Sequence, residues 1–123
     1  MNRYIQFKNS MGHAIHGLRY VITHEKNFQS ELFVALLVII AMIYFKVTRG
    51  EMVVLFMVIM LVLILEILNT IMERVVDILK PRIHPYAKLI KDLMAASVLV
   101  SSILAIIVGI IIFIPYLSPY FVK

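Results

Sequence analysis

The feature that most constrains this chain is a run of fourteen consecutive apolar residues, 52–65, that leads directly into polar positions. The polar positions are Glu66, Asn69, Glu73 and Asp77, and no glycine or proline intervenes to end a helix. A helix that is apolar on every side belongs in lipid or in a deep core. One helix is therefore expected to carry polar side chains from inside an apolar region out to its surface.

Composition indicates that the apolar region is a membrane. Of the 123 residues, 63% are hydrophobic and 15% are charged, whereas soluble domains are about half apolar and about a quarter charged. There is no cysteine, which excludes disulfides and thiolate metal sites. The N-terminal residues are mixed in polarity and do not resemble a cleavable signal peptide. A single integral-membrane domain over residues 1–123 is expected.

Three segments are expected to span the membrane as helices: 28–47, 52–72 and 93–114. Each has about the 20 residues that a spanning helix needs, and the short link between the first two predicts a tight hairpin. Residues 3–23 differ, because their apolar side chains recur at three- and four-residue steps between polar ones, which predicts an amphipathic helix on the membrane surface. The predicted fold is an all-α membrane protein with three transmembrane helices plus an N-terminal surface helix. The apolar positions of the surface helix are Tyr4, Phe7, Met11, Ile15, Leu18 and Ile22.

The distribution of Lys and Arg predicts the orientation. With three spans, nine of these residues share one side with the N-terminus and the 74–92 loop, and three lie on the other. The positive-inside rule then places the N-terminus of this multi-pass protein in the cytoplasm. Binding of nucleic acid is not expected, because the chain has no basic, aromatic-rich soluble module. The nine are Arg3, Lys8, Arg19, Lys26, Arg74, Lys80, Arg82, Lys88 and Lys91.

The polar residues of the second span point to chemistry. On a helix, Glu66, Asn69, Glu73 and Asp77 fall within an arc of roughly 80° and form one polar stripe. A solvated helix end explains Asp77 well and Glu66 poorly, since a carboxyl inside the membrane usually faces a partner or a cavity. Such a group suits the uptake of a proton, as a general base requires.

A second polar cluster precedes the third span. Lys91 and Asp92 are expected at the depth where the stripe emerges, and Glu25, at the end of the surface helix, lies at the same level. Lys88 needs no role in the site, because a lysine at the membrane boundary commonly extends its charged end to water. Carboxylates for a hard cation, cations for phosphate and a buried base together fit phosphoryl transfer. The chain has no glycine-rich phosphate-binding loop.

These residues carry a resemblance to a known family. The segments "EILNTIMERVVD" (66–77) and "KDLMAASVLV" (91–100), with "GLRYVITHEKNF" (17–28) before them, resemble the bacterial integral-membrane diacylglycerol kinase and undecaprenol kinase family. The resemblance covers nearly the whole chain. It implies a homotrimer of three-span subunits, with active sites at subunit interfaces that use MgATP and a lipid alcohol.

The resemblance also assigns roles to individual residues. It implies that Glu66 is the general base, that Glu25 and Glu73 bind Mg²⁺, and that Lys91 offsets the charge on the transferred group. Further positions match residues that line the site. On the nucleotide side these are Glu25, Glu73, Asp77, Lys91 and Asp92, with His84 and His13 as further nucleotide contacts, and on the lipid side they are Glu66, Asn69 and Ala95.

Two choices are left open: the lipid that is phosphorylated, and a function other than a kinase. The segments "IHPYAKLIKD" (83–92) and "GIIIFIPYL" (109–117) resemble the undecaprenol branch more than the diacylglycerol branch. The alternative is a non-enzymatic bundle or a small proton-coupled transporter centred on Glu66. A transporter predicts a charge path to both faces, whereas here the polar groups are expected to stop on one side, with the first span and most of the third free of ionisable residues.

Overall fold

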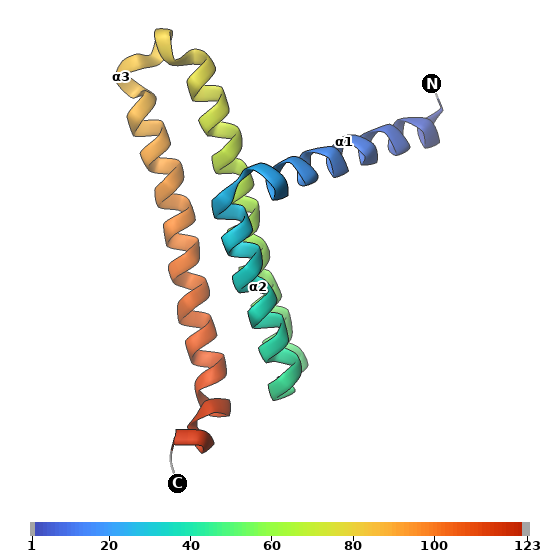
Figure 1. Ribbon diagram of the computed structural model, residues 1–123, viewed down its shortest axis with the longest axis vertical. Helices are drawn as coiled ribbons and strands as arrows, with labels where there is room; N and C mark the ends of the chain where they lie inside the picture. Colours follow the sequence, from blue (N-terminus) through green and yellow to red (C-terminus); the bar gives the residue numbers. More distant parts are fainter. Residues whose placement is uncertain (1, 122–123) are drawn as a thin grey trace.

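The structure, a computed structural model, describes residues 2–121, which are almost entirely helical (Figure 1). Helix α1 is Arg3–His24, helix α2 is Lys26–Phe45 and helix α3 is Arg49–Phe121. The described residues include no strand, so the predicted all-helical class is confirmed. Helices α2 and α3 are each long and apolar enough to cross a membrane.

Helix α1 projects away from the other two helices (Figure 1). It begins where the side chain of Asn2 accepts a hydrogen bond from the Tyr4 N–H at 3.0 Å, which satisfies one of the free donors of the first turn. Val21 is its buried residue. The apolar side chains on which this helix was predicted are exposed along its length. An uncovered apolar face on an isolated helix is typical of a helix that lies on a membrane surface.

Two short connections set the directions of α1, α2 and α3. Glu25 has an extended backbone (φ −105°, ψ 110°), and it separates α1 from α2. Lys46, in the left-handed region (φ 53°), ends α2 at Phe45, two residues before the predicted end of the first span. The hairpin then closes with a capping box, in which the Glu51 N–H donates to Thr48 Oγ1 at 3.2 Å and the Thr48 N–H donates to Glu51 Oε1 at 3.0 Å.

Helix α3 contains one interruption, at Ile83 (φ −114°, ψ 21°), where the chain reverses direction (Figure 1). We call residues 49–82 the first arm and residues 84–121 the second arm. The segment 74–92, predicted to connect the second and third spans, is helical on both sides of Ile83. Pro81 and Pro85 flank the break; each lacks an N–H and restricts the residue before it, which concentrates the break there. The second arm also continues past 114, through Pro115, to Phe121.

The packed core lies at the hairpin end of the molecule. Met42, Val47, Leu55 and Ile112 form a buried cluster that joins α2 to both arms of α3. At the same end the Tyr116 hydroxyl donates a hydrogen bond to the Glu51 carboxylate and ties the second arm to the start of the first. The opposite end, toward Ile83, is left to carry the charged side chains.

Candidate functional site

The first arm of α3 carries the polar stripe that was predicted from the sequence. Glu66 and Asn69 are buried, with 3% and 7% of their surfaces exposed. Asn69 Nδ2 donates to Glu73 Oε1 at 3.3 Å, and the Thr70 hydroxyl donates back to the Glu66 carbonyl at 3.1 Å. Asn69 Oδ1 is buried and has no partner among the described residues. Because buried polar atoms are normally paired, this oxygen is available to a donor from a ligand or from a neighbouring chain.

Glu25 joins the stripe although it lies 49 residues from its partner along the chain. Arg74, one residue after Glu73, donates from Nη2 to Glu25 Oε1 at 3.0 Å and to the Tyr20 hydroxyl at 3.2 Å. The charges of Glu25 and Glu73 both act on Glu66. The extended backbone at Glu25, between α1 and α2, turns this carboxylate toward the first arm. Glu25 is thus brought to the region of Glu66 and Glu73, which lie seven residues apart on the first arm.

Lys91 is brought to the outer end of the stripe by the reversal at Ile83. Its Nζ donates to Asp77 Oδ1 at 2.6 Å, across the two arms of α3. This hydrogen bond, with the positive charge behind it, holds the pKa of Asp77 below its ordinary value. Asp92 pairs instead with Lys88, one turn earlier, at 2.6 Å. Asp77 therefore keeps Lys91 beside the stripe, while Asp92 forms an exposed pair on the other side of the same helix.

Three predicted site residues are not brought to the carboxylates within one chain. His13 is exposed on α1, His84 is exposed at the reversal, and Ala95 is exposed on the second arm. The two histidine side chains make no hydrogen bond with other described residues of this chain. Their assignment to the nucleotide, and that of Ala95 to the lipid side, stays a prediction.

Glu31 is a further candidate site residue that the sequence reasoning missed. It lies within the first apolar span, so the expectation that this span is free of ionisable residues is wrong. Its Oε2 is buried without a partner among the described residues, and its charge interacts with that of Glu66. The signal was present in the sequence, because Glu31 is an acidic residue inside the 28–47 window, six positions after Glu25.

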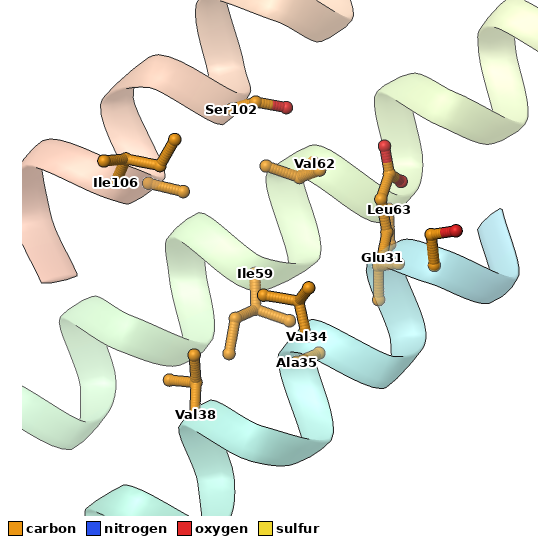
Figure 2. A pocket seen from close by; sticks show the side chains of 11 residues that line it. Glu31, Val34, Ala35, Val38, Ile59, Val62, Leu63, Ser102 and Ile106 are labelled. Carbon is orange, nitrogen blue, oxygen red and sulfur yellow. The ribbon is translucent and has the colours of Figure 1, made fainter. Parts of the chain in front are cut away.

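Glu31 also stands at an apolar cavity of about 270 Å³ between α2 and the two arms of α3. Figure 2 shows Glu31 at one end of this cavity, with Val34 and Val38 following it along α2 and Ile106 opposite on the second arm. The remaining lining is almost wholly aliphatic. The cavity therefore offers an apolar volume that ends at a carboxylate close to Glu66.

The acidic residues fit a magnesium site completed by a substrate. No group of three or more His, Cys, Asp or Glu side chains with metal-binding geometry occurs in the part of the chain that the structure describes. Mg²⁺ does not need one, since it is commonly held by one or two carboxylates together with phosphate oxygens and water. Glu25, held against Arg74, and Glu73, the residue before Arg74, are the two carboxylates that would form such a pair.

Comparison with known proteins adds two findings. The family model described as prokaryotic diacylglycerol kinase matches residues 12–113. An undecaprenol kinase from Bacillus subtilis (strain 168) is 34% identical to this chain over 116 residues, which cover 94% of each protein. Both matches include α2, the whole polar stripe and the reversal at Ile83.

Proposed function

The chain belongs to the prokaryotic diacylglycerol kinase family, and from this premise we propose that it phosphorylates undecaprenol, with diacylglycerol as the alternative substrate. It is an ATP-dependent lipid kinase. Undecaprenol is favoured because the relative that aligns along 94% of the chain is an undecaprenol kinase. The observation that carries the mechanism is Glu66, a carboxyl buried at the apolar end of a stripe that leads to exposed charges.

In the proposed reaction Glu66 acts as the general base. Its carboxylate takes the proton of the lipid hydroxyl while the hydroxyl oxygen forms a bond to the γ-phosphorus of ATP. The bond from that phosphorus to the β–γ bridging oxygen breaks, and ADP leaves. Asn69, whose Oδ1 has no partner among the described residues, lies one turn further along the helix and lines the same region. A positioned base of this kind contributes about 10²–10⁴-fold to a rate.

Glu25, Glu73 and Lys91 are assigned to the nucleotide. Glu25 and Glu73 would hold Mg²⁺, which supplies neutralisation of the phosphate charge when it is bound. Lys91, kept beside the stripe by Asp77, offers a positive charge to the transferred group. Because phosphoryl transfer depends mostly on positioning and charge neutralisation, these side chains suffice without a glycine-rich loop. His13, His84 and Asp92 are proposed as outer nucleotide contacts.

The lipid is proposed to approach from the cavity that ends at Glu31. The aliphatic lining suits a hydrocarbon chain, and the unpartnered Glu31 oxygen can accept a hydrogen bond from a hydroxyl. Val62 also lines this cavity and lies one helical turn before Glu66 on the same face of the first arm, so a hydroxyl at the Glu31 end approaches the proposed base. Ala95 is proposed to line the lipid side from the second arm.

We propose one membrane domain over residues 1–123 with three spans in the bacterial cytoplasmic membrane: 28–47, largely in α2, 52–72 in the first arm and 93–114 in the second arm. Helix α1 and the segment 74–92 around the reversal then lie on the cytoplasmic side. Nine of twelve Lys and Arg residues then lie in the cytoplasm. The exposed apolar face of α1 supports contact with the membrane surface. This orientation gives ATP direct access to the exposed end of the stripe.

A homotrimer with sites at subunit interfaces is proposed as the functional state. Large apolar side chains on all three helices are exposed in the single chain, and in a membrane they face lipid or a neighbouring subunit. Cross-linking of the purified protein in detergent tests the number of subunits. A largest product of two subunits, under conditions where the reaction goes to completion, would contradict the trimer.

The transporter alternative is not favoured by the distribution of ionisable side chains. Residues 32–43, 52–65 and 93–114 contain none. Fourteen helical residues correspond to about 20 Å along the axis, so no charge path connects Glu66 to the hairpin end. A kinase needs access for ATP from one side only, which this one-sided arrangement provides.

The proposed substrate is tested by offering γ-labelled ATP to the purified protein in mixed micelles that contain undecaprenol and diacylglycerol together. The label is expected mainly in undecaprenyl phosphate. Equal or preferential labelling of diacylglycerol would reverse the choice of lipid. Absence of label from both, in protein shown to bind MgATP, would refute the proposed function.

A further inference from the structure

Among the described residues, Arg74 makes the one side-chain hydrogen bond that joins the polar stripe's helix to α1. Its guanidinium donates to the Tyr20 hydroxyl at 3.2 Å and to the Glu25 carboxylate at 3.0 Å. We infer that Arg74 is a positioning residue, which fixes the surface helix to the first arm and thereby holds Glu25 in place for the metal and nucleotide. This inference rests on the proposed function, because it concerns the same site.

The position of Glu25 depends on a hinge that has little other support. Glu25 is the extended residue between α1 and α2, so its carboxylate moves whenever the angle between these helices changes. Val21 is the one buried residue of α1. A hydrogen bond from Gln29 Nε2 to the Ile22 carbonyl, at 2.8 Å, joins α1 to α2 but not to α3. The Tyr20–Arg74–Glu25 bridge is therefore the side-chain hydrogen-bonded link between α1, the hinge residue and the helix that carries Glu73.

The chemistry of the bridge suits this task. A guanidinium presents several donors in a fixed planar fork, so it can bond two acceptors at once and set their relative positions. Tyr20 is itself held, because its ring stacks on His24 with centroids 4.3 Å apart. His24 Nδ1 is in turn within 2.8 Å of the Thr23 hydroxyl. Stacking thus fixes the position of the Tyr20 ring and of the hydroxyl oxygen that accepts from Arg74.

The exposure of the bridging side chains indicates that the bridge contributes little to folding stability. The Arg74 side chain is 55% exposed and that of Glu25 is 19% exposed. Exposed ion pairs change equilibrium constants by at most about fivefold. Loss of the bridge is therefore expected to leave the protein folded and to act on the geometry of the site. A second role for an arginine here is direct contact with a phosphate, and the test has to distinguish the two.

The first measurement is affinity for MgATP, with a non-hydrolysable analogue for binding and the lipid kinase assay for KM and kcat. Arg74→Gln is expected to raise Kd and KM by up to about fivefold and to change kcat less. Arg74→Lys, which keeps the charge, recovers part of the loss. Tyr20→Phe, which removes only the acceptor on α1, shifts Kd in the same direction by a smaller factor. Arg19→Gln removes a neighbouring positive charge and serves as the control, with Kd unchanged.

The second measurement follows α1 itself, without ATP or lipid. The chain has no cysteine, so Lys8→Cys and Leu79→Cys place spin labels on α1 and on the first arm alone. Labelled chains are diluted with unlabelled ones, so that double electron–electron resonance reports distances within a subunit. One narrow distribution is expected in the otherwise native protein and a broad one with Arg74→Gln.

An unchanged distribution in Arg74→Gln would overturn the inference, whatever happens to the rate. An effect of Arg74→Gln on Kd with none from Tyr20→Phe would assign Arg74 to the phosphate and would also overturn it. The distance measurement needs no turnover, so it tests the role of Arg74 even if the chain phosphorylates neither lipid. Failure of the proposed function would be seen in the lipid kinase assay alone.

Discussion

Replacing Glu66 by glutamine is expected to stop phosphoryl transfer while the fold and nucleotide binding survive. Glutamine keeps the length of the side chain and one carbonyl oxygen, but it cannot take a proton from the lipid hydroxyl. Glu66 is 3% exposed, so water has little access to replace it as the base. The expected loss in kcat is about 10²–10⁴-fold, the range that a positioned general base contributes.

The effect on stability is expected to be small or favourable. Burial of a carboxyl in an apolar region is costly if it is charged, and an amide of the same shape removes that cost. The Thr70 hydroxyl bonds to the backbone carbonyl of residue 66 and not to its side chain, so this contact survives the substitution. The melting temperature of Glu66→Gln should therefore equal or exceed that of the native protein.

The assay is transfer of γ-labelled phosphate to undecaprenol in micelles, with binding of an ATP analogue measured in parallel. Glu51→Gln is the matched control, since it makes the same change at the opposite end of the first arm. The hydrogen bond from Tyr116 holds the pKa of Glu51 below its ordinary value, so this control also removes a negative charge. It should retain turnover. Near-native turnover in Glu66→Gln would refute the assignment of the base.

Three further predictions follow from the same geometry. Glu73→Gln should raise the Mg²⁺ concentration needed for half-maximal ATP binding, as measured by titration. With an impermeant maleimide, Thr48→Cys should label from outside the cell and Arg82→Cys only from the cytoplasm. The hydrogen bond from Lys91 lowers the pKa of Asp77. The contribution of this pair to folding stability is therefore fully present above the ordinary carboxyl pKa of about 4, and it is lost only as pH falls through the lowered pKa. The difference in melting temperature between native protein and Asp77→Asn should therefore be constant from neutral pH down to about 5.

Each of these has a contrary result. Unchanged Mg²⁺ dependence in Glu73→Gln would remove it from the metal site. Labelling of both cysteines from the same side would break the three-span proposal. A stability difference that disappears well above the ordinary carboxyl pKa would mean that Lys91 and Asp77 are not paired in solution.

The parts of the fold that the sequence predicted are those set by local periodicity. The apolar repeat of residues 3–23 predicted α1, and the short link after 47 predicted the hairpin, because both signals lie within a few turns of helix. The polar stripe was predicted for the same reason. Helix ends were less well predicted, because the predicted spans were bounded by hydropathy, whereas α2 ends at Phe45 and α3 continues past 114 to Phe121.

Contacts between distant residues could not be predicted from local pattern. The pair of Arg74 with Glu25 depends on the backbone at one hinge residue, and the pair of Lys91 with Asp77 depends on where α3 reverses. Lys91 and Asp92 were expected at one depth, but neighbouring residues on a helix point in different directions, and the two bond different partners. Glu31 was overlooked because one acidic residue hardly changes the mean hydropathy of a spanning segment.

The arrangement answers why so apolar a helix carries polar residues without a break. A lipid alcohol keeps its hydroxyl near the membrane boundary, whereas ATP stays in water, so the base and the metal ligands have to lie at different depths. Seven residues of helix separate Glu66 from Glu73, which is a rise of about 10 Å. A glycine or proline between them would allow the helix to bend, and the distance between Glu66 and Glu73 would then no longer be fixed. A continuous helix fixes the base relative to one metal ligand, and the second ligand, Glu25, has to come from another element, which is why its position depends on Arg74.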